Sequence, residues 1–277
     1  MPKNSVKTAL TTGSTDGIGR LVAQRLAASG VRVLVHGRDR TRGDEVVASI
    51  KQAGGEAEFL QADLSSLAEV RRLADAVQTA TKRLDILINN AGIGRGASET
   101  TRETSSDGYE LRFAVNYLSG FLLTYLLLRL ITKSAPARIV NVSSLGQQAI
   151  DFDDVMLTRN YSGMRAYRQS KLAQIMFTID LATELDGTGV TVNALHPATF
   201  MNTKMVREFG TPRSTVEEGA DAILKLAASA EMEGRTGLFF NSQTEARADL
   251  QAYDPEARQQ LKTLSLELVG RSGKADR

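Results

Sequence analysis

The sequence predicts an α/β fold: one domain over residues 1–277 with a doubly wound, parallel sheet of about seven strands and helices on both faces. Short apolar runs alternate with segments of helical periodicity along the whole chain. The runs are continuously apolar, which is typical of strands buried on both faces. No linker, repeat or low-complexity tract divides the 277 residues, and residues 272–277 are polar enough to form a frayed tail.

Seven apolar, often β-branched runs predict the strands. They are residues 6–11, 31–36, 57–62, 85–90, 137–142, 190–195 and 237–240. Helical periodicity predicts the helices that separate and follow these strands. The helices cover residues 20–29, 41–53, 66–81, 107–133, 165–185 and 216–229. Gly30 and the Gly54-Gly55 pair end the first two of them.

A glycine-rich turn, TGSTDGIG, joins the first strand to the first helix. Its amides and the helix N-terminus can hold a pyrophosphate, and its glycines let the backbone approach such a ligand. The spacing is Gly-x3-Gly-x-Gly and not the common Gly-x-Gly-x-x-Gly. The alternative to phosphate binding is a tight turn that needs glycine only for its positive φ angles. The position between strand and helix favours a phosphate-binding turn, with Gly13, Ser14, Thr15, Asp16, Gly17, Ile18 and Gly19 as candidate contacts.

Three long stretches without clear periodicity follow predicted strands, at residues 94–106, 146–164 and 198–214. Doubly wound sheets bind their ligands at the carboxyl ends of the strands. These stretches are therefore the expected walls of a substrate pocket.

Composition excludes several kinds of chemistry. The 34 Lys and Arg residues against 32 Asp and Glu give a net charge of +2, which offers no broad basic surface for nucleic acid. The absence of cysteine excludes disulfides and thiolate catalysis, and two histidines, His36 and His196, leave little for a metal site. No metal is expected.

The N-terminal segment MPKNSVKTAL has no apolar stretch of signal-peptide length, so a cytoplasmic location without membrane insertion is expected. The most apolar run, residues 120–131, is too short to span a bilayer and predicts a buried or interface helix.

The segment YRQSK places Tyr167 and Lys171 four residues apart on a predicted helix. Residues at this spacing share a face, where an ammonium can lower the pKa of a phenol. A phenol so tuned is a usable proton donor and acceptor. Alone the pattern is weak, because it occurs by chance on many solvated helix faces.

Together with TGSTDGIG, the NNAG of residues 89–92, Asn116 and a Ser on the fifth strand, this segment resembles the short-chain dehydrogenase/reductase family. The signatures span most of the chain. The phrases VNVSSLG, YRQSKLAQ and VNALHPAT are similar to its retinol dehydrogenase-like branch of carbonyl reductases. The resemblance implies a Rossmann-like fold and hydride transfer between a nicotinamide and a carbonyl or alcohol.

The resemblance also implies how a dinucleotide is held. The position of the family's ribose-binding acid falls on Gly37, and Arg38 follows, which implies NADP(H) with Arg38 on the 2′-phosphate. Three features leave NAD(H) possible. Asp39 could bind a ribose, Asp16 puts a negative charge in the turn, and Arg38 could be a plain surface charge. Asp63 and Leu64 resemble the adenine-edge contact, although Asp63 could instead cap a helix. Further expected contacts are Asn90, Ala91, Gly92, Pro197 and Thr199.

By the same resemblance, Tyr167 is the acid/base, and Lys171 binds the nicotinamide ribose and activates the phenol. Ser144, rather than Ser143, holds the substrate oxygen. Asn116 holds a water that connects Lys171 to solvent, with a buried Asn satisfied by backbone as the alternative. His196 is expected to be structural.

An apolar pocket wall is expected from Phe113, Met156, Met164, Phe200, Met201 and Met205, although core packing explains most of them equally well. Helices around residues 117–131 and 166–185 resemble those that join many family members into homodimers or homotetramers. The leading hypothesis is an NADP-dependent oxidoreductase for an apolar carbonyl or alcohol. Its alternatives are an NAD-dependent dehydrogenase, an epimerase or dehydratase of the extended branch, and a dinucleotide-sensing protein without turnover.

Overall fold

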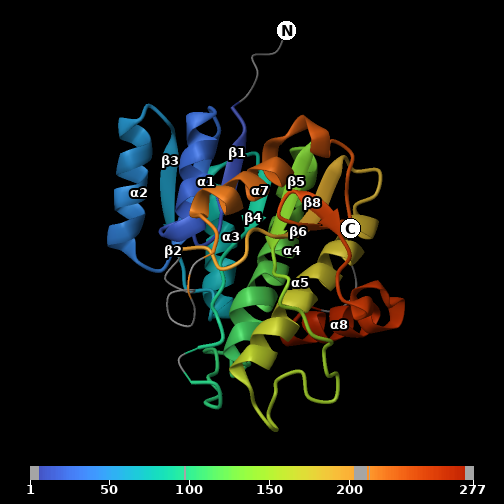
Figure 1. Ribbon diagram of the computed structural model, residues 1–277. Helices are drawn as coiled ribbons and strands as arrows, with labels where there is room; N and C mark the ends of the chain where they lie inside the picture. The colour runs from blue at the N-terminus through green and yellow to red at the C-terminus, as the bar shows by residue number, and fades with distance from the viewer. Residues whose placement is uncertain (1–5, 97, 203–210, 212, 272–277) are drawn as a thin grey trace.

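The computed structural model describes residues 6–96, 98–202, 211 and 213–271. Their strands form one eight-stranded sheet in the order β3-β2-β1-β4-β5-β6-β7-β8 (Figure 1). Neighbouring strands are parallel except β7 and β8, which are antiparallel. The strands are β1 (Thr8–Thr11), β2 (Arg32–Gly37), β3 (Ala57–Gln61), β4 (Ile86–Asn89), β5 (Ala137–Val142), β6 (Val190–His196), β7 (Phe239–Asn241) and β8 (Thr244–Ala246).

The predicted fold class is confirmed, and each predicted strand is present. β8 was not predicted because its sequence, TEA, has no apolar run, and it is placed by its antiparallel pairing with β7. The tail at residues 272–277 lies outside the described residues.

The helices are α1 (Gly17–Ala28), α2 (Arg40–Gln52), α3 (Leu67–Ala80), the π-helical η1 (Phe113–Leu118), α4 (Ser119–Lys133), α5 (Gly163–Glu184), α7 (Val216–Ala228), the short η2 (Ala230–Met232) and η3 (Leu250–Tyr253), and α8 (Pro255–Leu268). α1 begins before the expected start because the Asp16 carboxylate accepts a hydrogen bond from the Gly17 amide (2.7 Å) and caps it.

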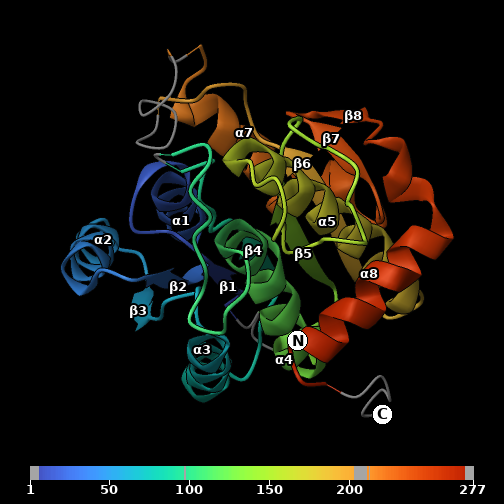
Figure 2. The same cartoon turned by 90° about the horizontal axis from the view of Figure 1, so that it is seen from below.

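The sheet lies between two apolar cores, as expected for a doubly wound fold (Figure 2). One core packs α1, α2 and α7 on the sheet, through side chains such as Val22, Val46 and Ile223. The other packs α3, α4 and α5, through Leu73, Leu122 and others. Helices on both faces leave the carboxyl ends of the strands open for a ligand.

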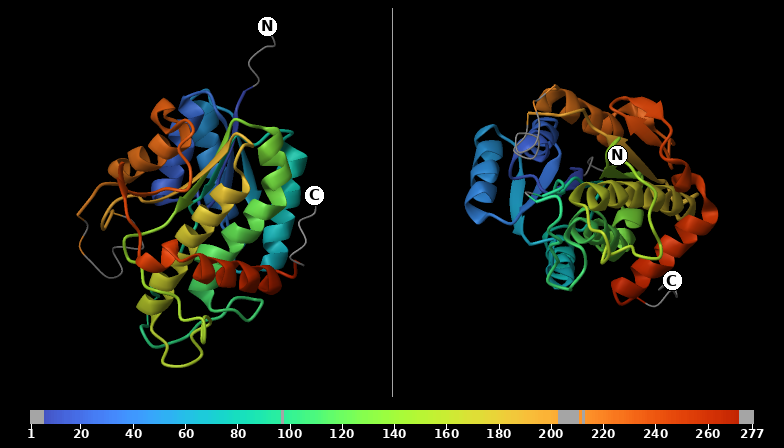
Figure 3. Two further views of the ribbon diagram at one scale, coloured as in Figure 1. Left: turned by 90° about the vertical axis from the view of Figure 1, so that its right-hand side faces the viewer. Right: turned by 60° about the horizontal axis from the view of Figure 1, so that its bottom comes forward.

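The C-terminal helix α8 was missed, although Asp254 and Pro255 form a helix start that the sequence shows. α8 lies across α5 (Figure 3). Arg258 Nε donates to Asp180 Oδ1 (2.6 Å), and the buried hydroxyls of Tyr117 and Ser265 are 2.7 Å apart. Association of copies through α4 and α5 stays a prediction.

The apolar run at residues 120–131 lies in the predicted helix at residues 107–133, which begins at Phe113 in the structure. Phe113–Lys133 forms one continuous helix of mean hydropathy 1.5, and by length and composition it is long enough to cross a membrane. The run alone is as short as expected, but the π-helical turns before it lengthen the helix. Most of it is buried in the fold, against α3 and α5, which is also how the core helix of a soluble protein packs.

Candidate active site

The glycine-rich turn has a backbone that side chains would not permit. Gly13 and Gly17 have φ angles of +63° and +51°. A Cβ on Gly19 would lie 2.3 Å from the Gly13 carbonyl oxygen. The Asn90 amide group donates to the carbonyls of Thr12 (2.8 Å) and Gly13 (3.1 Å), which ties the end of β4 to the turn. This cradle at the N-terminus of α1 fits a dinucleotide pyrophosphate.

His36 supports the glycine-rich turn through a hydrogen bond, a role that no motif in the sequence indicates. The Gly13 amide donates to His36 Nδ1 (3.1 Å), and the ring is buried. Burial lowers the pKa of His36 from 6.5 to about 4, so the ring is neutral in the folded protein at pH 7. Neutral imidazole is the form that can accept this hydrogen bond.

This burial predicts a loss of stability in mild acid. Between pH 6.5 and 4 the unfolded chain binds a proton at His36 that the folded chain does not, so the free energy of unfolding falls as the pH falls. We expect His36 to contribute a loss of about 2 kcal/mol between pH 7 and 5. Urea unfolding at both pH values checks this, with His36→Asn expected to show a smaller loss. An equal loss in both proteins would contradict the assignment.

A pocket of about 540 Å³ opens at the carboxyl edge of the sheet. It joins the glycine-rich turn to the ends of β4, β5 and β6 and the first turns of α5. Its lining is Gly13, Asp16, Gly17, Ile18, Gly19, Asn90, Gly92, Gly94, Arg95, Val142, Ser143, Ser144, Leu145, Gly146, Met164, Tyr167, Arg168, Lys171, His196, Pro197, Ala198, Thr199, Phe200 and Met201. The three predicted wall segments all contribute, as far as the structure describes them.

Ser144 and Tyr167 meet in this pocket across Gly146. A Cβ on Gly146 would lie 3.4 Å from Ser144 Oγ and 3.6 Å from Tyr167 Cε1. The hydroxyl of Ser143 instead donates to the Lys171 carbonyl (2.7 Å) and is committed to holding α5. The geometry therefore favours Ser144 over Ser143 as the group that faces a ligand.

The predicted lowering of the Tyr167 pKa is wrong for the chain itself. Burial raises the pKa of Tyr167 above its usual value, and the contact with Ser144 only partly opposes this. Lys171 Nζ lies 5.8 Å from the centre of the Tyr167 ring and donates to Val142 O and Gln174 Oε1 (both 2.9 Å). Burial also lowers the pKa of Lys171 from 10.5 to about 7, so its charge is partial at neutral pH.

Asn116 lies in η1, where the wider π-helical turns carry its side chain toward the end of β4. Its Oδ1 accepts from the Ile93 amide (2.8 Å), and its Nδ2 donates to Ile93 O (3.1 Å) and Ser170 Oγ (3.0 Å). The π-helical turns distort the helix around Asn116, and the water that this residue would hold stays a prediction. The alternative of a backbone-satisfied Asn also holds, and the two are compatible.

Arg38 lies apart from the pocket lining, at the end of β2. Its side chain is 70% exposed, with Nη1 3.8 Å from Asp63 Oδ2. A Cβ on Gly37 would lie 2.5 Å from Thr15 Cγ2, so the position before Arg38 has no room for an acid unless Thr15 moves. Asp39 caps α2 through the Arg42 amide (3.1 Å), which commits it to the helix.

Asp63 and Leu64 follow β3 as expected. Asp63 Oδ1 accepts from the Ser65 amide (2.9 Å), so it stabilises the local turn, while Leu64 is buried in the core and offers only its backbone. Ala91 donates its amide to Thr12 Oγ1 (3.0 Å), which leaves its backbone committed to the turn.

Other predicted cofactor contacts lie in the glycine-rich turn and after β6. The Ser14 hydroxyl donates to the Thr11 carbonyl (2.7 Å), a structural contact. Pro197 and Thr199 line the pocket, and Thr199 Oγ1 lies 3.0 Å from His196 Nε2. Burial, followed by the charge of Lys171, lowers the pKa of His196 to about 4.

The apolar wall differs in part from the prediction. Met164, Phe200 and Met201 line the pocket, and Leu145 joins them. Phe113 instead packs on Tyr117 in the core (ring centres 5.1 Å apart), and Met156 packs against the same core. Both therefore contribute to the core and not to the lining of the pocket. Met205 lies outside the described residues.

Sequence reasoning also missed Gln174, Arg95 and Arg168. Gln174 could have been found, because it stands three residues after Lys171 on the same helix face. Arg95 and Arg168 line the pocket. Among the described residues, the structure shows no cluster of His, Cys, Asp or Glu that could hold a metal.

The family model described as "short chain dehydrogenase" matches residues 7–214 of the chain. The chain belongs to the short-chain dehydrogenase family. Human retinol dehydrogenase 14 is 37% identical over 295 residues, a match that covers 95% of this chain and 86% of the relative. Human retinol dehydrogenase 13 is also 37% identical and covers 95% of this chain and 85% of the relative.

One solved structure similar to the dehydrogenase is the active-site complex of Pseudomonas aeruginosa RhlG with NADP. It is 31% identical, with a TM-score of 0.70 over 86% of this chain and 95% of that chain. A putative gluconate dehydrogenase from Agrobacterium tumefaciens has the same TM-score at 25% identity, over 85% of this chain and 93% of that chain. The dehydrogenase is thus a dinucleotide-dependent oxidoreductase of retinol dehydrogenase-like sequence.

Proposed function

We propose that this dehydrogenase transfers hydride between NADP(H) and an apolar carbonyl or alcohol, with Tyr167 as the acid/base. The observation that carries the proposal is the meeting of Ser144 and Tyr167 across Gly146, in the pocket that the glycine-rich turn also lines. A dinucleotide on that turn would extend toward these two hydroxyl groups. A sensor without turnover has no need of such an arrangement.

When bound, the nicotinamide supplies or accepts the hydride. The chain supplies the rest. The Ser144 hydroxyl would hold the substrate oxygen, and the Tyr167 phenol would donate its proton to that oxygen in reduction. Because burial raises the pKa of Tyr167, the phenol is protonated at neutral pH, which is the form that reduction requires. Lys171 borders Gly92 in the pocket, where it could bind a ribose hydroxyl.

The preference for NADP(H) is argued from the end of β2. Gly37 leaves no acid at the position that would bind a 2′-hydroxyl, and Asp39 is committed to capping α2. Arg38 is exposed there, and its guanidinium can form paired hydrogen bonds with a 2′-phosphate. The NADP in the solved RhlG complex supports the same choice.

Arg38→Ala tests this preference through fluorescence titration with NADPH and NADH. We expect the variant to bind NADPH about tenfold or more weakly and NADH nearly unchanged, because only NADPH carries the phosphate that Arg38 would pair with. Arg72→Ala is the matched control, since Arg72 on α3 is equally exposed at 71%. The assignment would be contradicted if the variant lost affinity for both cofactors equally. It would also be contradicted if the parent protein bound NADH more tightly than NADPH.

The substrate class follows from the apolar part of the pocket. Leu145, Met164, Phe200 and Met201 line it beside Ser144 and Tyr167. Such side chains favour an extended or bulky apolar group next to the reacting carbon. The retinol named for the relatives is an alcohol of this kind, so retinal and long-chain aldehydes are the first compounds to test.

A further inference from the structure

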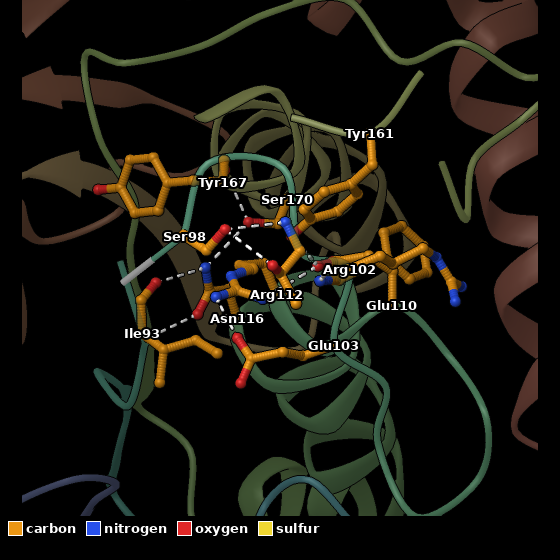
Figure 4. A network of polar contacts seen from close by, with 12 residues as sticks. Ile93, Ser98, Arg102, Glu103, Glu110, Arg112, Asn116, Tyr161, Tyr167 and Ser170 are labelled. Carbon is orange, nitrogen blue, oxygen red and sulfur yellow. Dashed lines mark hydrogen bonds and ion pairs between the residues drawn. The ribbon is translucent and has the colours of Figure 1, made fainter. Parts of the chain in front are cut away.

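Arg112 and Glu110 form a buried ion pair outside the residues that face the pocket. Their side chains are 2% and 1% exposed, and Arg112 Nη1 lies 3.6 Å from Glu110 Oε1. Figure 4 shows Glu103, Glu110 and Tyr161 around Arg112, with Asn116 beside it. Removing two charges from water destabilises a fold, and their mutual attraction offsets this cost only when the geometry is good. Well-packed apolar residues in the same place often give equal stability. A role beyond stability therefore has to be sought in what the pair holds.

The Arg112 guanidinium holds the segment that follows β4. Its Nε donates to the Gly94 carbonyl (3.2 Å), and its Nη2 donates to Glu103 Oε2 (2.7 Å). Gly96 has a φ angle of +90°, and a Cβ on it would lie 1.9 Å from Arg112 Nη2. The loop backbone is thus fitted closely around the guanidinium. Gly94 itself lines the pocket.

Glu110 holds the start of η1 and the segment that leads into α5. Its Oε2 accepts from the Phe113 amide (2.7 Å) at the start of η1, and its Oε1 accepts from the Tyr161 hydroxyl (3.1 Å). Tyr161 belongs to the segment that leads from β5 into α5. The pair therefore joins the loop after β4 and the loop before α5 to one short stretch of helix.

The same stretch of helix reaches the reacting groups through Asn116. Asn116 binds both backbone groups of Ile93, next to Gly94, and donates to Ser170. The Ser170 hydroxyl donates to the Tyr167 carbonyl (2.7 Å). Asn116 thus holds residue 93, and Arg112 holds residue 94 next to it. Through Ser170, this contact also fixes the position of the helix turn that carries Tyr167.

The two loops also meet directly. Glu99 accepts hydrogen bonds from the Ser162 hydroxyl and from the Met164 amide (3.0 Å) at the start of α5. Met164 lines the pocket beside Tyr167. A shift of the loop after β4 would therefore move both the wall and the N-terminus of the helix that carries the phenol.

We propose that Arg112 and Glu110 are a positioning pair that sets the substrate-side walls of the pocket relative to Tyr167. The proposal rests on the function proposed above, in that the pocket takes a carbonyl substrate. Neither side chain is among those that line the pocket. Its effect is expected on substrate binding, and not on cofactor binding, because the glycine-rich turn makes no contact with it.

Tyr161→Phe is the mild test, because it removes only the hydroxyl that binds Glu110. Tyr125→Phe is its matched control, since the Tyr125 hydroxyl also bonds a carboxylate, that of Glu184 (3.0 Å), between α4 and α5 and away from the pocket. We expect Tyr161→Phe to raise KM for decanal about fivefold, with kcat and the Kd for NADPH nearly unchanged. The control should change none of these.

Arg112→Lys is the stronger test, because it keeps a positive charge opposite Glu110 but loses the planar fork that holds Gly94 and Glu103. We expect kcat/KM to fall about tenfold or more through KM. Hydrogen–deuterium exchange should become faster in residues 94–106 and 154–164 of both variants, while exchange in α1 and α2 stays as in the parent.

Unchanged KM together with unchanged exchange in the two loops would overturn the proposal. So would a parallel rise in the Kd for NADPH, which would indicate a general loss of structure. If the parent protein turns over no carbonyl compound, the proposed function fails instead, and the exchange measurement still decides whether the pair holds the two loops.

Discussion

Tyr167→Phe is expected to lower kcat for carbonyl reduction by about 10²–10⁴-fold, the usual contribution of a positioned proton donor. The variant keeps the ring, and so the packing against Gly146 and Ser144, but has no proton to give to the substrate oxygen. NADPH binding should stay close to that of the parent. Steady-state rates with decanal, together with fluorescence titration of the cofactor, check both parts.

Tyr125→Phe is a suitable control for this substitution as well, because it loses a phenol hydroxyl far from the pocket. It should retain parental turnover. If Tyr167→Phe turned over decanal at the parental rate, the proton would have to come from another group, and the assignment of Tyr167 would be wrong.

Gly19→Val is expected to weaken NADPH binding by about a hundredfold or more, through a clash at the dinucleotide turn. Even a Cβ at this position would lie 2.3 Å from the Gly13 carbonyl oxygen and 2.5 Å from Asn90 Nδ2. The turn would have to open, which would move the amides at the N-terminus of α1 away from the pyrophosphate. Fluorescence titration measures the loss, and urea unfolding shows whether the variant still folds.

Gly120→Ala is the control for that substitution. Gly120 lies in α4, where a Cβ would find its first neighbour at an ordinary 3.4 Å, from Asn89 Cγ. The control should bind NADPH like the parent. A folded Gly19→Val variant with parental affinity would show that the cofactor does not lie on this turn.

Local signals in the sequence were enough to predict the sheet and the motif residues that line the pocket. Apolar runs and glycine-ended helices follow from short-range preferences, so the strands from β1 to β7 and the helices between them could be predicted. The turn, Ser144, Tyr167 and Lys171 are each marked by a short motif. The structure brings these motifs into one pocket, as expected from strand ends that share one edge of a parallel sheet.

What depends on distant contacts could not be predicted in the same way. The pKa of Tyr167 is set by burial from all sides, and Lys171 turns toward Val142 and Gln174. His36 is an ordinary strand residue until the turn is folded over it. The pairing of Arg112 with Glu110 and Tyr161 joins residues up to 51 positions apart, and no periodic pattern marks it. Two features were missed despite a readable signal. These are α8, with its Asp254-Pro255 start, and Gln174, which stands three residues after Lys171 on the same helix.

The most direct test of the account is the oxidation of NADPH by the purified protein in the presence of decanal or all-trans-retinal. The reaction is followed by the loss of reduced-nicotinamide absorbance and by the alcohol formed. We expect one alcohol for each NADPH consumed, slower reaction with NADH, and loss of the reaction in Tyr167→Phe. A protein that binds NADPH but oxidises it with neither aldehyde, or that does so equally well without Tyr167, would contradict the account.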